Sequence, residues 1–382
     1  VDSTGTKLIT TSVANTLTGS QTLETWLVAQ AQQRQIEHLA IATEATSFYD
    51  FHLVEFLSQS DVLAPYQPVI YRFNPRPVKA FKASLKLRDK TDPTDAYATA
   101  EYLRFHQGHA LPYRCHQAHL SLQRLTRFRH HLVQQLTREK SYFLTHLFLH
   151  FSTLDKGHPF SDLFGATATA LIDDWMTPDE IATTSPEALR QFVIQRSRNR
   201  FADPAAIVRE LQRVAKASYR LTPALADSIR HVLCLTLATI RALTASLTTL
   251  NTTIVKELES FPNTLTSIPG IGPVYAAGIF AELGEIHAFP SHAQVAKLAG
   301  LIWPRTQSGE FEAEDRRMDK QANAYLRYYL IEAADSLRRH NPEYRAYYQK
   351  KYAEVTKHQH KRALVLTARK FVRLVHALLT KT

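Results

Sequence analysis

The hydrophobic pattern divides the chain into a mixed first part and a helical remainder. Short apolar runs at 7–13 (KLITTSV), 37–43 (EHLAIAT) and 68–73 (PVIYRF) predict strands. Residues 23–33 and 47–59, which separate these runs, have the apolar spacing of helices. Because strands that alternate with helices usually pair in parallel, we predict an α/β layer.

Helical patterns occupy the rest of the chain. A helix is expected from Asp92 to about His106, and short helices separated by prolines are expected between 156 and 220. Residues 240–258 place apolar side chains three and four apart, which is typical of a coiled-coil seam: Ile240, Leu243, Leu247, Leu250, Ile254 and Leu258. The predicted fold class is therefore an α/β domain at 1–116, a helical linker and coiled coil at 117–258, and an all-α domain at 259–382.

The charge is concentrated near the C-terminal end. The formal net charge is +11, and residues 305–382 hold 17 Lys and Arg against nine Asp and Glu. Such an excess favours a polyanionic partner, because cations release phosphate counterions on binding. In residues 344–352, tyrosines alternate with cations, as on surfaces that stack bases. Solvated basic helices and ordinary core packing are the alternatives.

Two cysteines are too few for a disulfide framework, which favours a reducing cytoplasm. We expect no membrane-spanning segment, because the sequence shows no uninterrupted apolar run of about 18–20 residues.

Three acids in the first domain are candidate ligands of a divalent cation. Glu44 follows a predicted strand, at the end where open α/β sheets place ligands, and Asp92 and Asp95 share the first turn of a helix. Mg²⁺ prefers such oxygen ligands in phosphodiester chemistry. A basic loop at 74–91, which includes Lys90, precedes the two aspartates. The alternative is that Asp-Pro-Thr-Asp is simply a good helix start.

The segment 256–283 predicts a helix, a Pro-Gly-Ile-Gly-Pro turn and a second helix at 274–283. Gly270 and Gly272 permit a tight turn, and free N–H groups at the start of the second helix can hold a phosphate. This arrangement is that of a helix-hairpin-helix, which binds nucleic-acid backbones. A plain connection between helices is the alternative.

Ser308 lies in a polar loop after Arg305 and is a candidate nucleophile. Lys320, Asn323 and Arg327 follow at helical spacing, on one flank of an apolar stripe. Cations and an amide on such a flank suit a phosphate whose charge grows during reaction. A loop serine beside a solvated helix edge is the alternative.

Together these segments resemble the insertion-sequence transposases that join a RuvC-like DEDD domain to a serine-containing transposase domain, the bridge-RNA-guided recombinases. The resemblance covers nearly the whole chain. It rests most on 90–96 (KTDPTDA), 267–283, 299–301 (AGL), 307–309 (QSG), 326–327 (LR) and 332–334 (EAA), together with the basic segments 344–351 and 369–370.

The resemblance implies an RNase H/RuvC-like first domain whose DEDD site holds Mg²⁺ or Mn²⁺, with Glu44, Asp92 and Asp95 as ligands. It also implies that Ser308 attacks a DNA phosphodiester and forms a phosphoserine intermediate. A structured guide RNA and a homo-oligomer, dimer or tetramer, in which the two sites complement each other across subunits, are implied as partners of the DNA.

Two departures from the family accompany this resemblance. The first Asp of the family lies on an opening strand, so we expect it to fall ahead of residue 1. Asp2 is then a turn residue rather than a ligand. Ala322 stands where the family usually has glycine.

Two other functions stay open. A metal-only junction endonuclease would use the C-terminal domain for grip alone. A derivative that binds nucleic acid without catalysis would cut no strand.

Overall fold

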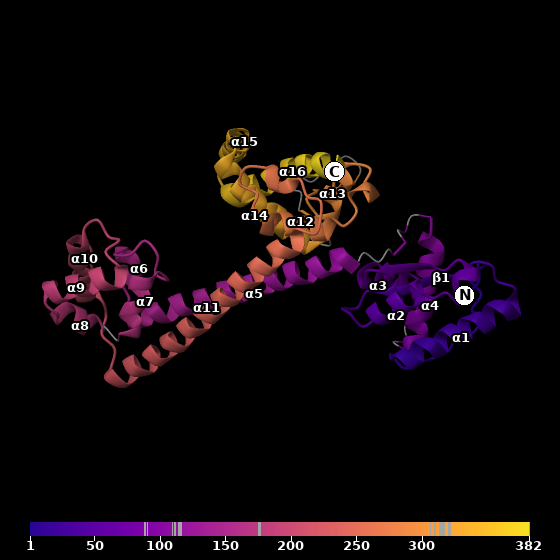
Figure 1. The fold of residues 1–382 in the computed structure, drawn as a ribbon, viewed down its shortest axis with the longest axis horizontal. Coiled ribbons are helices and arrows are strands. Elements are labelled where there is room, and N and C mark those ends of the chain that lie inside the picture. Colours follow the sequence, from indigo (N-terminus) through magenta and orange to yellow (C-terminus); the bar gives the residue numbers. More distant parts are fainter. Residues whose placement is uncertain are drawn as a thin grey trace. The chain divides into compact units, whose positions relative to one another are not determined.

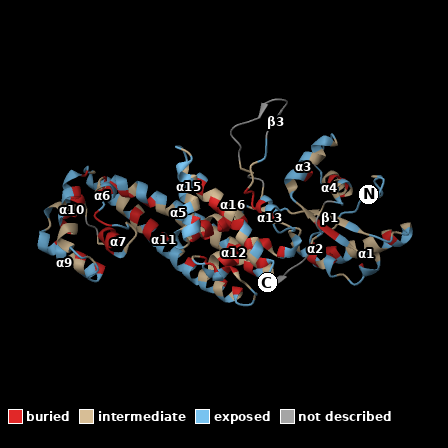
Figure 2. Ribbon diagram, turned by 90° about the horizontal axis from the view of Figure 1, so that it is seen from above, coloured by how far each residue is buried: buried red, intermediate tan, exposed pale blue. Residues whose placement is uncertain are grey.

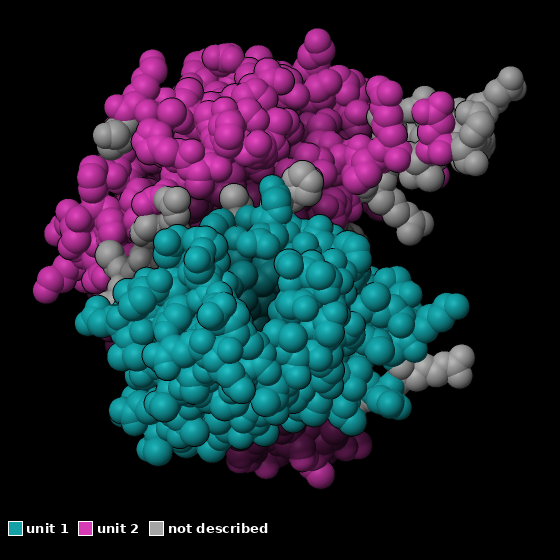
Figure 3. Space-filling view, turned by 90° about the vertical axis from the view of Figure 1, so that its right-hand side faces the viewer, with its two compact units in different colours: residues 1–117 teal, residues 118–382 magenta. Residues whose placement is uncertain are grey.

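The computed structural model describes the chain except for residues 88, 90, 109, 111, 114–116, 175–176, 306, 309–310, 313–317, 320–321 and 382. The chain separates into two compact units, Val1–Gln117 and Ala118–Thr382. Figure 1 shows the elements of each unit, and Figure 3 colours the two units separately.

Unit 1 is the predicted α/β layer. Its elements are α1 (Leu17–Arg34), β1 (Ala40–Glu44), α2 (Phe51–Ser58), a 3₁₀ turn η1 (Ala64–Tyr66), β2 (Val69–Phe73), α3 (Pro75–Ser84) and α4 (Asp92–His106). β1 and β2 pair in parallel, from Ala40 opposite Val69 to Glu44 opposite Phe73. A small core between α2 and the sheet buries Val54, Leu57, Leu63 and Ile70. The parallel strand pair with its intervening helix is confirmed.

The predicted strand at 7–13 is wrong, since these residues form no ladder with another described segment. A strand exists only where a neighbour accepts and donates its backbone hydrogen bonds, and sequence periodicity cannot supply that neighbour. Leu8 and Ile9 consequently stay 38% and 48% exposed. Asp2 lies in a turn as expected, where its Oδ1 accepts hydrogen bonds from the backbone N–H groups of Thr4 and Thr6, both at 2.9 Å.

The basic segment after β2 contains a helix that the sequence analysis missed. α3 begins after Asn74, whose side chain accepts a hydrogen bond from the N–H of Arg76, and Pro75 takes the first helical position. Asn followed by Pro is a sound helix-start signal, so this helix could have been predicted. It places Lys82 beside the start of α4.

Unit 2 begins with helices whose starts are encoded locally. The elements are α5 (Gln117–His150, which begins at the last residue of unit 1), α6 (Leu154–Gly157), α7 (Ala166–Asp173), α8 (Pro178–Thr183), α9 (Pro186–Ser197), α10 (Pro204–Ala217) and α11 (Pro223–Leu258). The last four each open with proline after Thr, Ser or Asp, the residues preferred at an N-cap. The expectation of short helices separated by prolines is confirmed.

The long helices α5 and α11 run antiparallel. Ser121 donates a hydrogen bond to Glu257 at 2.7 Å, and Arg129 donates to Asn251 at 2.7 Å, so residues farther along α5 meet residues earlier in α11. Figure 1 shows the two helices crossing each other. Four of the six predicted seam positions are buried in α11: Ile240, Leu247, Ile254 and Leu258.

One described helix, α11, is long and apolar enough to cross a membrane by length and composition alone. The core helix of a protein in water meets the same criterion, because one of its faces is apolar. The buried residues of α11 contribute to two apolar cores, one with α5 through α10 and one with the C-terminal helices. A single helix of this kind is weak evidence for a membrane.

The C-terminal part contains η2 (Leu265–Ser267), α12 (Pro273–Leu283), η3 (Ile286–Ala288), α13 (His292–Leu298), a hairpin of β3 (Gln307–Ser308) and β4 (Phe311–Glu312), α14 (Ala324–His340), α15 (Pro342–Ala353) and α16 (Gln359–Leu379). Figure 2 shows buried residues gathered around α12 and α16, and α14 buries six residues as well. The mostly helical character of 259–382 is confirmed, although the β3–β4 hairpin departs from the all-α expectation, while a separate domain that begins at 259 stays a prediction.

Close approach of α12 and α14 requires a glycine. A Cβ on Gly278 would lie 2.3 Å from the ring of Tyr329, well inside van der Waals contact. The Tyr329 hydroxyl donates a hydrogen bond to the Thr126 carbonyl of α5 at 2.7 Å. Burial raises the pKa of this phenol, so it stays a donor at all physiological pH values. The tyrosine therefore links three helices.

A buried carboxylate joins the same three helices. The side chain of Glu282 at the end of α12 has no exposed surface, and it accepts hydrogen bonds from Arg127 Nε at 2.6 Å and Nη2 at 2.8 Å. Asn323 Nδ2, at the start of α14, donates to the same carboxylate at 2.8 Å. We call these three residues the Glu282 cluster. It ties α5, α12 and α14 at one point.

We predict that Glu282→Gln lowers the free energy of unfolding of unit 2 by about 3 kcal/mol, because it leaves the guanidinium of Arg127 without an anion in a largely buried place. Urea denaturation, followed by the fluorescence of Trp303 in a chain whose other two tryptophans are replaced, measures this change.

The matched control is Glu187→Gln, which removes the charge from an exposed ion pair with Arg190 on α9. It should cost less than about 1 kcal/mol, because water screens such a pair. Equal costs for the two variants would contradict the structural role of the Glu282 cluster.

Candidate functional site

Two of the three candidate acids meet in unit 1. Glu44 is the last residue of β1, and Asp92 and Asp95 both lie in the first turn of α4, which packs against β1. Asp95 forms an ion pair with Lys82 of α3, whose side chain is only 15% exposed. The end of the strand and the start of the helix thus bring Glu44, Asp95 and Lys82 into one group.

The electrostatics of Glu44 follow from this position. Burial raises the pKa of Glu44 above its usual value, the negative charge of Asp95 raises it further, and Lys82 opposes both effects. A carboxylate pair that repels itself in this way is stabilised by a cation.

No group of three His, Cys, Asp or Glu side chains able to hold a metal forms within the described residues. The three-acid site with Asp92 therefore stays a prediction. Glu44 and Asp95 alone still fit Mg²⁺ or Mn²⁺, because Mg²⁺ commonly takes one or two carboxylates and completes its shell with water and substrate phosphate oxygens.

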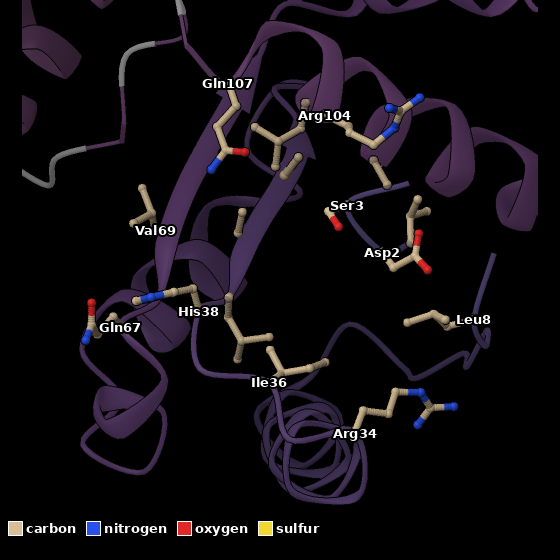
Figure 4. A pocket seen from close by; sticks show the side chains of 16 residues that line it. Asp2, Ser3, Leu8, Arg34, Ile36, His38, Gln67, Val69, Arg104 and Gln107 are labelled. Atoms are coloured by element: carbon tan, nitrogen blue, oxygen red, sulfur yellow. The ribbon is translucent and has the colours of Figure 1, made fainter. Parts of the chain in front are cut away.

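The large cavity of unit 1, about 950 Å³, lies elsewhere. It borders β1 at Ala40 and Ala42, and Figure 4 shows Leu8, Ile36 and Arg34 around it. None of the candidate site residues lines this cavity. β1 has β2 as its only strand neighbour among the described residues, so its other edge is unpaired.

The two glycines in the turn before α12 differ in backbone conformation and in the space around them. Gly270 has a φ of 91°, and its carbonyl accepts a hydrogen bond from Ser336 of α14 at 2.6 Å. Gly272 is the N-cap of α12, and a Cβ there would meet nothing within 4 Å. Gly270 is thus fixed by conformation, while the space at Gly272 is open.

The helix that precedes this turn differs from expectation. α11 ends at Leu258, and the single 3₁₀ turn η2 stands before the glycines, while α12 begins at Pro273, next to the predicted start. The helix-hairpin-helix stays a prediction, with η2 in the place of its first helix.

The structure describes only some of the residues around the candidate serine. Ser308 lies in β3, where its backbone pairs with Phe311, and its side chain lies outside the described part of the chain. Lys90 and Lys320 also lie outside the described residues. Arg305 is exposed after α13. The serine as nucleophile stays a prediction.

Asn323 and Arg327 both have structural partners. The Asn323 side chain accepts hydrogen bonds from the N–H groups of Tyr325 and Leu326 as the cap of α14, in addition to its bond with Glu282. Arg327 Nη1 donates to the carbonyl of Asp319 at 3.2 Å and to that of Ala299 at 3.4 Å. These bonds fix the end of the segment that follows the serine.

Sequence reasoning missed two residues that shape these regions. Lys82 was included in a basic loop, although the Asn-Pro start of α3 would have placed it on a helix. Glu282 is a lone acid in an apolar helix, and that isolation is a signal of a buried, paired charge.

An N-terminal and a C-terminal segment of the chain are similar to known transposase sequences. The DEDD transposase model of IS110 elements, described as "Transposase", matches residues 1–152. The model "Transposase IS116/IS110/IS902 family" matches residues 263–349. A curated relative, "Transposase for insertion sequence element IS1111A" from Coxiella burnetii (strain RSA 493 / Nine Mile phase I), is 36% identical over 74 residues, which span 19% of this chain and a fifth of that relative. Residues 1–152 and 263–349 are therefore similar to transposase domains of the IS110/IS116 insertion-sequence family.

Proposed function

We propose that the protein cuts and rejoins DNA as the transposase of an insertion sequence. The observation that supports this most is the pair Glu44 and Asp95, which the fold holds together at the end of β1 although their charges repel. The match of residues 1–152 to a DEDD transposase domain supports the same chemistry.

In this proposal Glu44 and Asp95, with Asp92, hold Mg²⁺ or Mn²⁺. When bound, the ion would stabilise negative charge on the scissile phosphate. Lys82 forms an ion pair with Asp95 and thereby orients its carboxylate before the ion arrives. Because the pKa of Glu44 is raised and the ion requires the carboxylate, we expect ion binding to weaken as the pH falls.

Ser308 is the proposed nucleophile. Its hydroxyl oxygen would form a bond to the phosphorus and lose its proton, while the bond between phosphorus and the leaving sugar oxygen breaks and that oxygen is protonated. The phosphoserine ester would then be attacked by a sugar hydroxyl of the new DNA partner, which restores the serine. Gly272, Arg305, Lys320, Asn323 and Arg327 are proposed to hold neighbouring phosphates, as are Gly270 and Lys90.

A structured guide RNA and a homo-oligomer belong to this proposal as partners. The family resemblance supports both, and the net charge of +11 favours polyanionic partners in general.

One observation favours a second candidate, a derivative that binds nucleic acid without cutting it. The ammonium group of Lys82 already neutralises Asp95. An internal cation at this place would make a metal ion unnecessary for the fold. Cleavage of DNA that depends on Mg²⁺ or Mn²⁺ distinguishes the two candidates.

We predict that Glu44→Gln raises the melting temperature of the metal-free protein near neutral pH. The folded state holds the proton of Glu44 more tightly than the unfolded chain does, so its contribution to stability is lost as the pH rises from the ordinary value of 4.5 through the raised pKa. The variant has no proton to lose. The gain in melting temperature of Glu44→Gln over the wild type should therefore vanish below about pH 4.

The same melting experiment tests the metal. Millimolar Mn²⁺ should raise the melting temperature of the wild type and leave that of Glu44→Gln unchanged. Asp61→Asn, which removes an exposed acid of the same unit, is the control and should respond like the wild type. An equal response of Glu44→Gln would remove Glu44 from the metal site.

We predict that Ser308→Ala abolishes covalent protein–DNA adducts and leaves DNA affinity within about twofold, because the change removes one hydroxyl and no charge. Denaturing gels of end-labelled DNA detect the adduct. Ser267→Ala, at an exposed serine of the same domain, should keep it. Adducts that persist in Ser308→Ala would exclude this serine as nucleophile, and metal-dependent cleavage without adducts would identify a metal-only nuclease.

A further inference from the structure

The last helix has many cations and no acid. Residues 359–382 contain six Lys and Arg and no Asp or Glu, and residues 338–382 contain twelve against two. Some of these cations are paired with the two acids of α15 and the turn after it. Lys370 pairs with Glu343 at 2.6 Å, and Arg362 pairs with Glu354 at 3.1 Å.

Two arginines of α16 have no such partner. Arg369 and Arg373 lie one helical turn apart, and neither makes an ion pair or a side-chain hydrogen bond with the described part of the chain. Nη1 of Arg369 is buried without any partner, while Arg373 is exposed. A guanidinium has five N–H donors, so an unpartnered and partly buried one is an uncommon and costly arrangement.

The neighbouring helix α13 adds a histidine and no acid at this place. His292, the first residue of α13, faces α16 and has a buried Nδ1 without a hydrogen-bond partner. His376 lies one turn beyond Arg373, and its Nε2 donates a hydrogen bond to the Phe289 carbonyl at 2.9 Å. Figures 1 and 2 both show α13 next to α16. We call Arg369, Arg373, His292 and His376 the α16 cationic cluster.

The guanidinium charges of Arg369 and Arg373 repel each other electrostatically. Burial lowers the pKa of Arg369, and the charge of Arg373 lowers it further. Burial also lowers the pKa of His292, with smaller contributions from Arg369, Arg373 and His376. Among the described residues, no carboxylate opposes these effects on the pKa of Arg369 or His292. An unpaired charge in such surroundings is destabilising unless an anion compensates it.

We propose that the α16 cationic cluster is a binding site for a backbone phosphate of DNA, with Arg373 as its exposed entrance and Arg369 as its partly buried base. The proposal rests on the proposed function in taking DNA as the partner. A guanidinium pair suits a phosphate, because planar N–H forks match its oxygens. The surrounding excess of cations would attract a polyanion to this face.

We predict that replacing either arginine weakens DNA binding, and that replacing Arg369 also stabilises the free protein. Arg373→Ala should weaken binding of a 30-base-pair duplex about tenfold at 0.1 M salt, the size of one lost hydrogen bond to a charged group. It should also reduce the slope of log affinity against log salt by about one. Arg369→Met should weaken binding similarly and yet raise the melting temperature of the free protein by about 2–4 °C, since it replaces a repelled charge with an apolar side chain of similar length.

Fluorescence anisotropy of the labelled duplex over a salt series, together with thermal melting of the full chain, measures these effects. Lys216→Ala is the matched control, because it removes one exposed, unpaired cation from α10. It should leave the affinity within about twofold, unless net charge alone governs binding. A loss in Lys216→Ala equal to that in Arg373→Ala would overturn the site.

The remaining outcomes separate the site from the proposed function. A wild type that binds no DNA would contradict the proposed function itself and the site with it. If the wild type binds DNA and both arginine variants bind it equally well, the phosphate site on α16 is wrong while the proposed function stands. Inorganic phosphate is the second probe. If 10 mM phosphate stabilises the wild type but not Arg369→Met, while DNA affinity does not differ between them, the site serves a small anion and the DNA assignment is wrong.

Discussion

A single buried carboxylate organises the C-terminal part of this protein. Glu282 has no exposed surface, so its charge requires partners, and Arg127 of α5 and Asn323 at the start of α14 supply them. Because each partner comes from a different helix, the relative positions of three helices are fixed by the need to compensate one charge. The segment that contains Ser308 then ends at a fixed point, the N-cap of α14.

Two half-buried charges elsewhere in the chain are compensated less well. Glu44 has a like charge, Asp95, as a neighbour and one lysine to oppose it. Arg369 has another cation, Arg373, as its neighbour and no acid. Folding alone gains nothing from such arrangements, whereas the binding of an ion of opposite charge removes the repulsion. The contrast with Glu282 is what makes these two places candidates for ligands.

The two candidate ligands complement each other chemically. A divalent cation at Glu44 and Asp95 suits a reacting phosphodiester, and cations on α16 suit a phosphate that does not react. The proposed cutting and joining of DNA needs both kinds of contact, because phosphate contacts away from the chemistry position the strand. The charge distribution agrees, with most of the positive excess in the C-terminal fifth.

The sequence by itself determined the helix starts, the parallel strand pair and the family resemblance. Proline after Thr, Ser or Asp fixes a helix start through backbone geometry within a few residues, as at Pro178 and Pro204. The tertiary structure alone decided that 7–13 forms no strand, that Lys82 meets Asp95, and that Glu282 meets Arg127. Ladder pairing and charge compensation depend on segments 13 to 155 residues apart, and no local pattern encodes such a meeting.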